Sequence, residues 1–251
     1  MTVSVAYVES FFLALTRILA IFQTAPILSN RLIPTQVKVG LGVLLTAILL
    51  PFQAEVGPAD PLGVFLLNIG RELVTGMLVG FAGQLVFAAF QIMGDMIGLT
   101  AGLQAAYLLN PTLGTSGTAL ESFYALLAAL LFLTIDGHHQ VILALQRTFE
   151  IVPLRTLDLA VLQPERLIAL SAHMLAAALQ MALPVIGAVL VADVAMALMA
   201  RVVPQMNVFF VGAPLKLGLA LAAVVLSSPL LLPLMRTVMA QIGPEMVRVL
   251  H

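Results

Sequence analysis

Long apolar runs separated by short polar breaks dominate this chain. We count roughly six of them by their hydrophobic pattern, at Val5–Ala25, Val37–Leu50, Leu62–Tyr107, Ala119–Ile135, Glu165–Ala200 and Asn207–Met239. Runs of this length and hydrophobicity are typical of helices that lie in or against a membrane. We therefore predict an all-α fold, a membrane-associated bundle of long, kinked helical hairpins.

The lengths of these runs are irregular. At ~1.5 Å per residue the second run spans only ~21 Å, short of the ~30 Å hydrocarbon core of a bilayer. Pro184 and Gly187 predict a kink in the fifth run. The polar residues Asp136–His139 separate the fourth run from a further apolar stretch, Val141–Glu150. Because irregular backbone inside a membrane must be covered, these features favour packing against other protein rather than lipid alone.

Glycines recur at intervals of four within the third run. They stand at two groups of positions, Gly76 with Gly80, and Gly94 with Gly98 and Gly102. This spacing places small residues on one helix face, where a neighbouring backbone can approach closely. We expect both groups to serve helix packing rather than a hinge.

The composition supports a membrane protein and excludes several other classes. Hydrophobic residues make up 61% of the 251 residues and charged residues 9%, with a mean hydropathy of +1.11. Soluble proteins carry about 25% charged residues. The net charge of −1 gives no electrostatic basis for binding nucleic acid. The absence of cysteine excludes disulfides and thiolate metal sites.

Sequence motifs for catalysis or metal binding are missing. The only lysines, Lys38 and Lys216, are each followed by an apolar residue, so neither belongs to a P-loop. The H-E-x-x-H and G-x-S-x-G motifs are absent too. His138 and His139 indicate a polar helix break rather than a metal site, because adjacent helical residues point ~100° apart. We predict no enzymatic activity and no cofactor.

Charged residues within the apolar runs need partners. A carboxylate such as Asp193 costs ~2.5–3.5 kcal/mol at mid-bilayer, against ~0.3–0.6 kcal/mol returned by one Leu or Val. We favour an ion pair or hydrogen bond between helices, with a proton relay as the alternative. Glu72, beside Arg71, poses the same choice. If both carboxylates instead coupled to an ion, the chain would be an independent secondary transporter, but its halves do not show the similar hydropathy that this class predicts.

The break between the last two runs concentrates polar groups between prolines. Arg201, Gln205, Asn207 and Lys216 stand there with Pro204 and Pro214. Proline removes a backbone donor and bends or ends a helix, so the freed carbonyls need polar side chains as partners. We expect the segment from Arg201 to Asn207 to hold this bend through such hydrogen bonds.

This stretch resembles the C-terminal signature of the family of flagellar biosynthetic protein FliR and its type III secretion export-gate counterparts. That signature reads roughly R-x-x-P-Q-x-N-V-F-x-x-G-x-P-x-K. Nine positions match in register: Arg201, Pro204, Gln205, Asn207, Val208, Phe209, Gly212, Pro214 and Lys216. Ala197 and Ala213 depart, standing where the family usually has Gly and Phe. Weaker likenesses follow in the family's order over nearly the whole chain, at Ala25–Pro26, Pro34–Gly40, Arg71–Phe81, Asn110–Gly114, Asp136–His139 and Ala182–Pro184.

The resemblance implies a structural role without catalysis. One copy would join FliP and FliQ in a helical, pore-forming hetero-oligomer, with FlhB and FlhA as neighbours and unfolded proteins in transit. Residues 1–164 would mimic FliP, and residues 165–251 would form a FliQ-like helical hairpin. The signature residues, with Glu72 and Asp193, would make structural or subunit contacts. The expected location is the bacterial inner (plasma) membrane, in the flagellar basal body, and the alternative setting is an injectisome.

The polar loop after the third run is the remaining candidate site. Its residue chemistry alone fits a plain surface turn as well as any sharper interpretation. The resemblance favours a plug that closes the resting channel, with Asn110 standing where the family usually has Asp. The predicted plug consists of Asn110, Pro111, Thr112, Leu113, Gly114, Thr115, Ser116 and Gly117.

Overall fold

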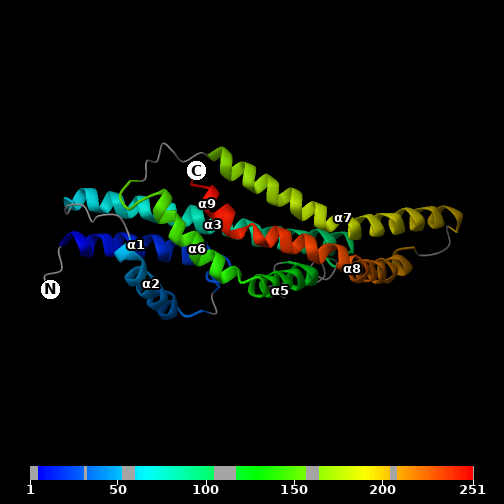
Figure 1. The fold of residues 1–251 in the computed structure, drawn as a ribbon. Helices are drawn as coiled ribbons and strands as arrows, with labels where there is room; N and C mark the ends of the chain where they lie inside the picture. The colour runs from blue at the N-terminus through cyan, green and yellow to red at the C-terminus, as the bar shows by residue number, and fades with distance from the viewer. Residues whose placement is uncertain are drawn as a thin grey trace. The chain divides into compact units, whose positions relative to one another are not determined.

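The computed structural model describes residues 5–30, 33–52, 60–104, 117–156, 164–203 and 208–250, with backbone only at 52, 164 and 208–211. Every regular element within these ranges is a helix, as Figure 1 shows. The elements are α1 (Val5–Thr24), α2 (Thr35–Leu49), the 3-10 turn η1 (Leu50–Phe52), α3 (Leu62–Thr100), α5 (Ala119–Thr134), α6 (Gly137–Ile151), α7 (Pro164–Val202), α8 (Val208–Ala240) and α9 (Ile242–Arg248). The predicted all-α fold is confirmed.

Four helical stretches are long and apolar enough to cross a membrane. They are α1, α3, Glu165–Val202 in α7, and Gly212–Arg248 across α8 and α9. The bent pair of α5 and α6 makes a fifth if it counts as one span. The second predicted run is α2, whose 15 residues are too few to span a bilayer. The roughly six predicted runs thus correspond to four or five candidate spans and one short helix.

Two predicted breaks lie elsewhere than expected. The break after α5 is shorter, because α6 already begins at Gly137 and includes both histidines in its first turn. Asp136 alone takes up the left-handed conformation, with φ of 54°, that allows the 72° bend. Asp tolerates this conformation better than most residues. The third run ends earlier than predicted, at Thr100, because Gly102 has a φ of 82° and terminates the helix instead of packing within it.

The last predicted run, Asn207–Met239, corresponds closely to α8, which begins at Val208 and continues through Pro214. Pro229 and Pro233 lie inside the same helix. Polar side chains make this tolerable: the Ser228 hydroxyl donates to the Val225 carbonyl at 2.8 Å, the group that Pro229 leaves without its backbone donor.

The chain divides into two compact units that each draw on distant parts of the sequence. One contains Met1–Val86, Asp136–Ser171 and Ala240–His251. The other contains Phe87–Ile135 and Ala172–Met239. The long helices α3 and α7 therefore contribute residues to both units.

In the first unit α1 packs closely on α3 across two glycines. A Cβ at Gly76 would lie 2.5 Å from the Arg17 carbonyl oxygen and 2.6 Å from the Ala20 Cβ. A Cβ at Gly80 would overlap Thr24. Because these glycines are four residues apart, they share one face of α3. The packing role predicted for this glycine pair is confirmed.

In the second unit the end of α3 packs against α5 and a stripe of α7. Buried Phe87 and Phe132 meet edge to face, with ring centroids 5.5 Å apart. The buried side chains of α7 recur every three or four residues, which is the pattern of one helix face. They are Met174, Ala178, Met181, Ala182, Val185 and Val189.

We predict that Gly76→Ala destabilises the first unit while Gly70→Ala on the same helix does not. The methyl group at position 76 overlaps α1, and overpacking costs typically about 1–3 kcal/mol. Nothing lies within 4 Å of a Cβ at Gly70, where alanine favours the helix by about 1 kcal/mol over glycine. Thermal aggregation in detergent extracts measures the difference, and equal midpoints for the two variants would contradict the close approach of α1 to α3.

Candidate functional site

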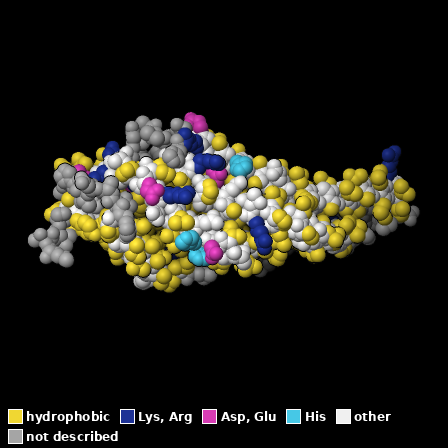
Figure 2. Space-filling view, viewed as in Figure 1, with side chains coloured by type: hydrophobic (Ala, Val, Ile, Leu, Met, Phe, Trp, Pro, Cys, Tyr) yellow, Lys and Arg dark blue, Asp and Glu magenta, His cyan; other side chains and the backbone are white. Residues whose placement is uncertain are grey.

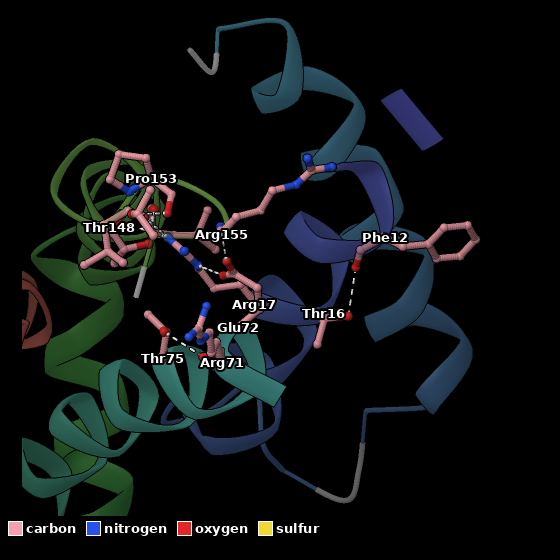
Figure 3. Close-up of polar contacts among 12 residues, drawn as sticks. Phe12, Thr16, Arg17, Arg71, Glu72, Thr75, Thr148, Pro153 and Arg155 are labelled. Carbon is pink, nitrogen blue, oxygen red and sulfur yellow. Dashed lines mark hydrogen bonds and ion pairs between the residues drawn. The ribbon is translucent and has the colours of Figure 1, made fainter. Parts of the chain in front are cut away.

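A fully buried ion pair joins α1 to α3. The Nε atom of Arg17 lies 2.6 Å from Oε2 of Glu72, and both side chains have an exposure of 0% (Figure 3). An isolated charge at such a position would suffer a large loss of hydration. The two charges can therefore remain buried only together and with further hydrogen bonds around them.

The remaining contacts of Arg17 lie at the end of α6. Its Nη1 atom donates to the carbonyl oxygens of Thr148 at 3.0 Å and Val152 at 2.7 Å. These carbonyls belong to the C-terminal turn of the helix, where unpaired carbonyls carry partial negative charge. The guanidinium also lies 4.5 Å from the centre of the Phe149 ring, a cation–π distance. Arg17 thus connects α1, α3 and α6.

The other oxygen of Glu72 is held by the turn that follows α6. The backbone N–H of Arg155 donates to Oε1 at 3.1 Å. Arg155 has a φ of 72°, and its side chain reaches Glu9 at 3.2 Å and Asp60 at 3.4 Å. The turn is therefore fixed by its backbone on one side and by its side chain on the other.

These contacts belong to one polar cluster within the first unit. Asn68 donates to Asp60 at 3.0 Å and accepts from Arg71 at 3.3 Å, which extends the cluster along α3. Its charges balance, because three arginines face three carboxylates. The polar cluster consists of Glu9, Arg17, Asp60, Asn68, Arg71, Glu72 and Arg155.

A second ion pair joins α7 to α8 in the other unit. The Nζ atom of Lys216 lies 2.8 Å from Oδ2 of Asp193. With exposures of 23% and 38%, these side chains lie only partly inside the chain. Nearby, a Cβ at buried Gly212 would lie 2.8 Å from the Met196 sulfur, so the two helices approach closely there. The ion pair and the glycine hold the two helices as a hairpin.

Residues 8–242 match the family described as "Bacterial export proteins, family 1". The chain belongs to this family. Flagellar biosynthetic protein FliR of Pectobacterium carotovorum subsp. carotovorum is 35% identical over 237 residues, which cover 91% of this chain and 88% of that protein. FliR of Escherichia coli K12 is 33% identical over 238 residues, with coverages of 91% and 87%. FliR of Bacillus subtilis 168 is 27% identical over 235 residues, with coverages of 91% and 90%.

Membership in the FliR family defines the general role of the chain. It is a membrane-embedded component of flagellar protein export, because the family comprises bacterial export proteins and these relatives are flagellar. The resemblance inferred from the C-terminal signature is confirmed. The names of these relatives describe flagellar biosynthesis and not an enzymatic reaction.

The FliR signature residues are only partly described by the structure. Arg201 is exposed at the end of α7, and Pro214 is exposed inside α8. Phe209 lies in the first turn of α8, described by its backbone alone. Pro204, Gln205 and Asn207 lie outside the described residues. The structure brings Lys216 together with Asp193, two residues that the sequence had singled out separately.

The predicted plug also lies largely outside the described part of the chain. Of Asn110–Gly117 only Gly117 is described. The next residue, Thr118, begins α5 as its N-cap, accepting a hydrogen bond from the Glu121 N–H at 3.1 Å. The end of the loop is thereby well defined.

The two carboxylates considered for ion coupling are both engaged by cations. Both oxygens of Glu72 accept hydrogen bonds within the polar cluster, and Asp193 is paired with Lys216. Among the described residues no group of three or more metal-ligating side chains occurs. The geometry around these carboxylates therefore matches structural pairing between helices.

Two arginines that complete the polar cluster were not among the predicted site residues. Arg17 interrupts the first apolar run, and Arg155 lies in the polar connection after Val141–Glu150. A usable signal existed for one pair, since Arg17 and Glu72 are opposite charges that each interrupt an apolar helix. No local signal indicated Arg155, because its role depends on a turn with positive φ.

We predict that Arg17→Met destabilises the protein severely. Breaking a buried pair costs about 3–5 kcal/mol, because Glu72 would be left buried without compensation, out of a total stability of about 5–15 kcal/mol. The double variant Arg17→Met with Glu72→Met should lose less stability than either single variant, because no unpaired charge remains buried. Arg147→Met, an exposed arginine of α6, is the matched control and should be nearly neutral.

The measurements are the level of membrane-inserted protein and its thermal aggregation midpoint in detergent. If the double variant lost as much stability as the two single variants combined, the two charges would not be coupled.

Proposed function

We propose that this FliR-family chain is a structural subunit of the flagellar type III protein export gate. With FliP and FliQ it forms the channel through which unfolded flagellar proteins are exported, next to FlhB and FlhA. The complex resides in the bacterial inner membrane, in the flagellar basal body. The relatives named FliR support the flagellar setting over the injectisome alternative.

The observation that carries this proposal is the uncovered apolar surface of α7 and α8. An 18-residue stretch within Glu165–Val202 and another within Gly212–Arg248 each have a mean hydropathy of 2.2, yet only 28% and 11% of these two stretches are buried within the chain. Figure 2 shows hydrophobic side chains spread over much of the visible surface. Exposed apolar patches of this extent mark contacts with lipid or other subunits. They include Leu190, Val191, Val194, Leu198, Val225, Leu226 and Leu230.

The same proposal assigns a different role to each of two parts of the chain. Residues 165–251 act as a FliQ-like hairpin, held together by Asp193 and Lys216, and residues 1–164 act as the FliP-like part. A paired Asp193 lets the hairpin lie against apolar neighbours without an uncompensated charge. The exposed Arg201 contacts a neighbouring subunit in this proposal, and the polar groups of Gln205 and Asn207 are assigned the same role.

The loop Asn110–Gly117 serves as the plug of the resting channel in this proposal. It contains no charged residue, so entry into a narrow lumen involves no ionic desolvation. Its hydroxyl groups, at Thr112, Thr115 and Ser116, can hydrogen-bond within a wet pore. Export then requires the plug to move aside, without any catalytic step in this subunit.

We predict that the chain alone aggregates or is degraded, and that co-expression with FliP and FliQ yields one complex. The reason is that the apolar surface of the hairpin then becomes covered by neighbouring subunits. The measurement is affinity purification of the tagged chain from a mild detergent extract, followed by size-exclusion chromatography. A monodisperse chain of native fold without partners would contradict the proposal, and would favour an independent transporter.

A further prediction concerns the plug. Shortening Pro111–Gly117 should leave the complex assembled while making the inner membrane permeable to a normally excluded solute. Assembly should persist because the shortening removes no residue of α3 (Leu62–Thr100) or α5 (Ala119–Thr134). Solute uptake or conductance is measured in cells that carry the complete complex, after blotting has shown wild-type levels. A complex that assembles normally and stays as tight as wild type would rule out this loop as the plug.

A further inference from the structure

The end of α3 is closed by a turn that uses the carbonyl oxygen of Gly98. The N–H of Leu103 donates to this oxygen at 3.0 Å, and the N–H of Gly102 donates to Leu99 at 3.1 Å. Together with the positive φ of Gly102, these two bonds form the Schellman arrangement that ends helices. The start of the loop that joins α3 to α5 is therefore anchored to the carbonyl oxygen of Gly98.

The beginning of α5 is fixed on the same residue. A Cβ at Gly98 would overlap all three heavy atoms of the Thr118 side chain beyond Cα. One turn earlier, a Cβ at Gly94 would lie 2.7 Å from both the Glu121 Cα and the Leu120 carbonyl oxygen. Thr118 is buried, and its hydroxyl donates to the Gly94 carbonyl at 3.4 Å. The end of the loop is therefore packed directly against Gly98 through Thr118.

The entry side of this junction is braced by the α7–α8 hairpin. Half-buried Leu103 packs against a buried apolar cluster of Ala101, Val189 and Ala220. Val189 and Ala220 lie four residues, about one helical turn, from Asp193 and Lys216 respectively. The ion pair of the hairpin thus lies beside the apolar contact that holds the start of the loop.

We propose that Gly98 is a joint that holds both ends of the α3–α5 loop together and thereby positions the predicted plug. The missing side chain admits Thr118, and the backbone carbonyl anchors Leu103. Any residue larger than glycine separates the two ends by displacing Thr118. The consequence for the channel rests on the proposed function of the loop, but the joint itself does not.

The first test measures whether the two ends lie together in the assembled complex. The chain contains no cysteine, so Gln104→Cys with Ala119→Cys introduces the only thiols of this subunit, at two exposed positions. A short bis-maleimide should link the pair efficiently. Gln104→Cys with Leu133→Cys is the matched control, because Leu133 is exposed on the same helix but ~21 Å further along it. Absence of linking in the first pair would overturn the proposal.

The second test adds one methyl group at the joint. Gly98→Ala should lower the linking efficiency on the order of ten-fold, because overpacking costs typically about 1–3 kcal/mol and about 1.4 kcal/mol corresponds to a tenfold change in an equilibrium. Gly187→Ala is the matched control, since nothing lies within 4 Å of a Cβ there. Gly98→Ala with Thr118→Gly should restore linking, because the overlapping atoms are gone and glycine remains an acceptable N-cap. Linking unchanged in Gly98→Ala, or unrestored in the double variant, would contradict the joint.

Solute leakage separates this inference from the proposed plug. Gly98→Ala should leak in an assembled complex, and Gly98→Ala with Thr118→Gly should be tight again. If the shortened loop leaks but Gly98→Ala does not, the plug stands and the joint fails as its positioning device. If linking responds as expected but neither the shortened loop nor Gly98→Ala leaks, the joint stands and the plug fails.

Discussion

The buried pair of Arg17 and Glu72 is the interaction on which the first unit depends. In place of water, each charged group is surrounded by its partner and by hydrogen bonds from or to the carbonyls at the end of α6 and the N–H of Arg155. The contributing segments lie far apart in sequence, so no two of them satisfy the pair without the third. The helices α1, α3 and α6 therefore have to assemble together, and the close approach of α1 to the glycines of α3 brings the two charges within reach of each other.

The chain reverses the usual distribution of polar and apolar groups. Three ion pairs of the described residues are enclosed in the polar cluster, while large aliphatic side chains face outward on α2, α7 and α8. This arrangement is unfavourable in water and favourable against lipid or apolar subunits. The short helix α2 illustrates the point, because only Gly42 and Thr46 of its 15 residues are buried and it is too short to span a bilayer. A surface of this kind is consistent with a component of an export apparatus, whose neighbours complete the fold.

The features of the fold that depend on local sequence patterns could be predicted, whereas contacts between residues far apart in the sequence could not. Helix content followed from the apolar runs, and the family followed from the signature at Arg201–Lys216, because both are local patterns. The end of α3 was misjudged, since a glycine can lie within a helix or, as Gly102 does with its positive φ, terminate one. The partner of Glu72 is 55 residues away, and although both Arg17 and Glu72 interrupt apolar helices, only the fold shows that they meet. Asp193 and Lys216 were both identified, but only the fold pairs them.

The three prolines inside α8 have a mechanical consequence. Each one removes a backbone hydrogen bond, so the carbonyls of residues 210, 225 and 229 lack their normal helical donors. Bending a helix at such a point stretches no backbone hydrogen bond, whereas a proline-free helix of 33 residues would resist bending along its whole length. The helix is therefore a series of stiff segments joined at compliant points. Such a helix can follow a neighbouring surface that changes its curvature while the ion pair to α7 stays closed.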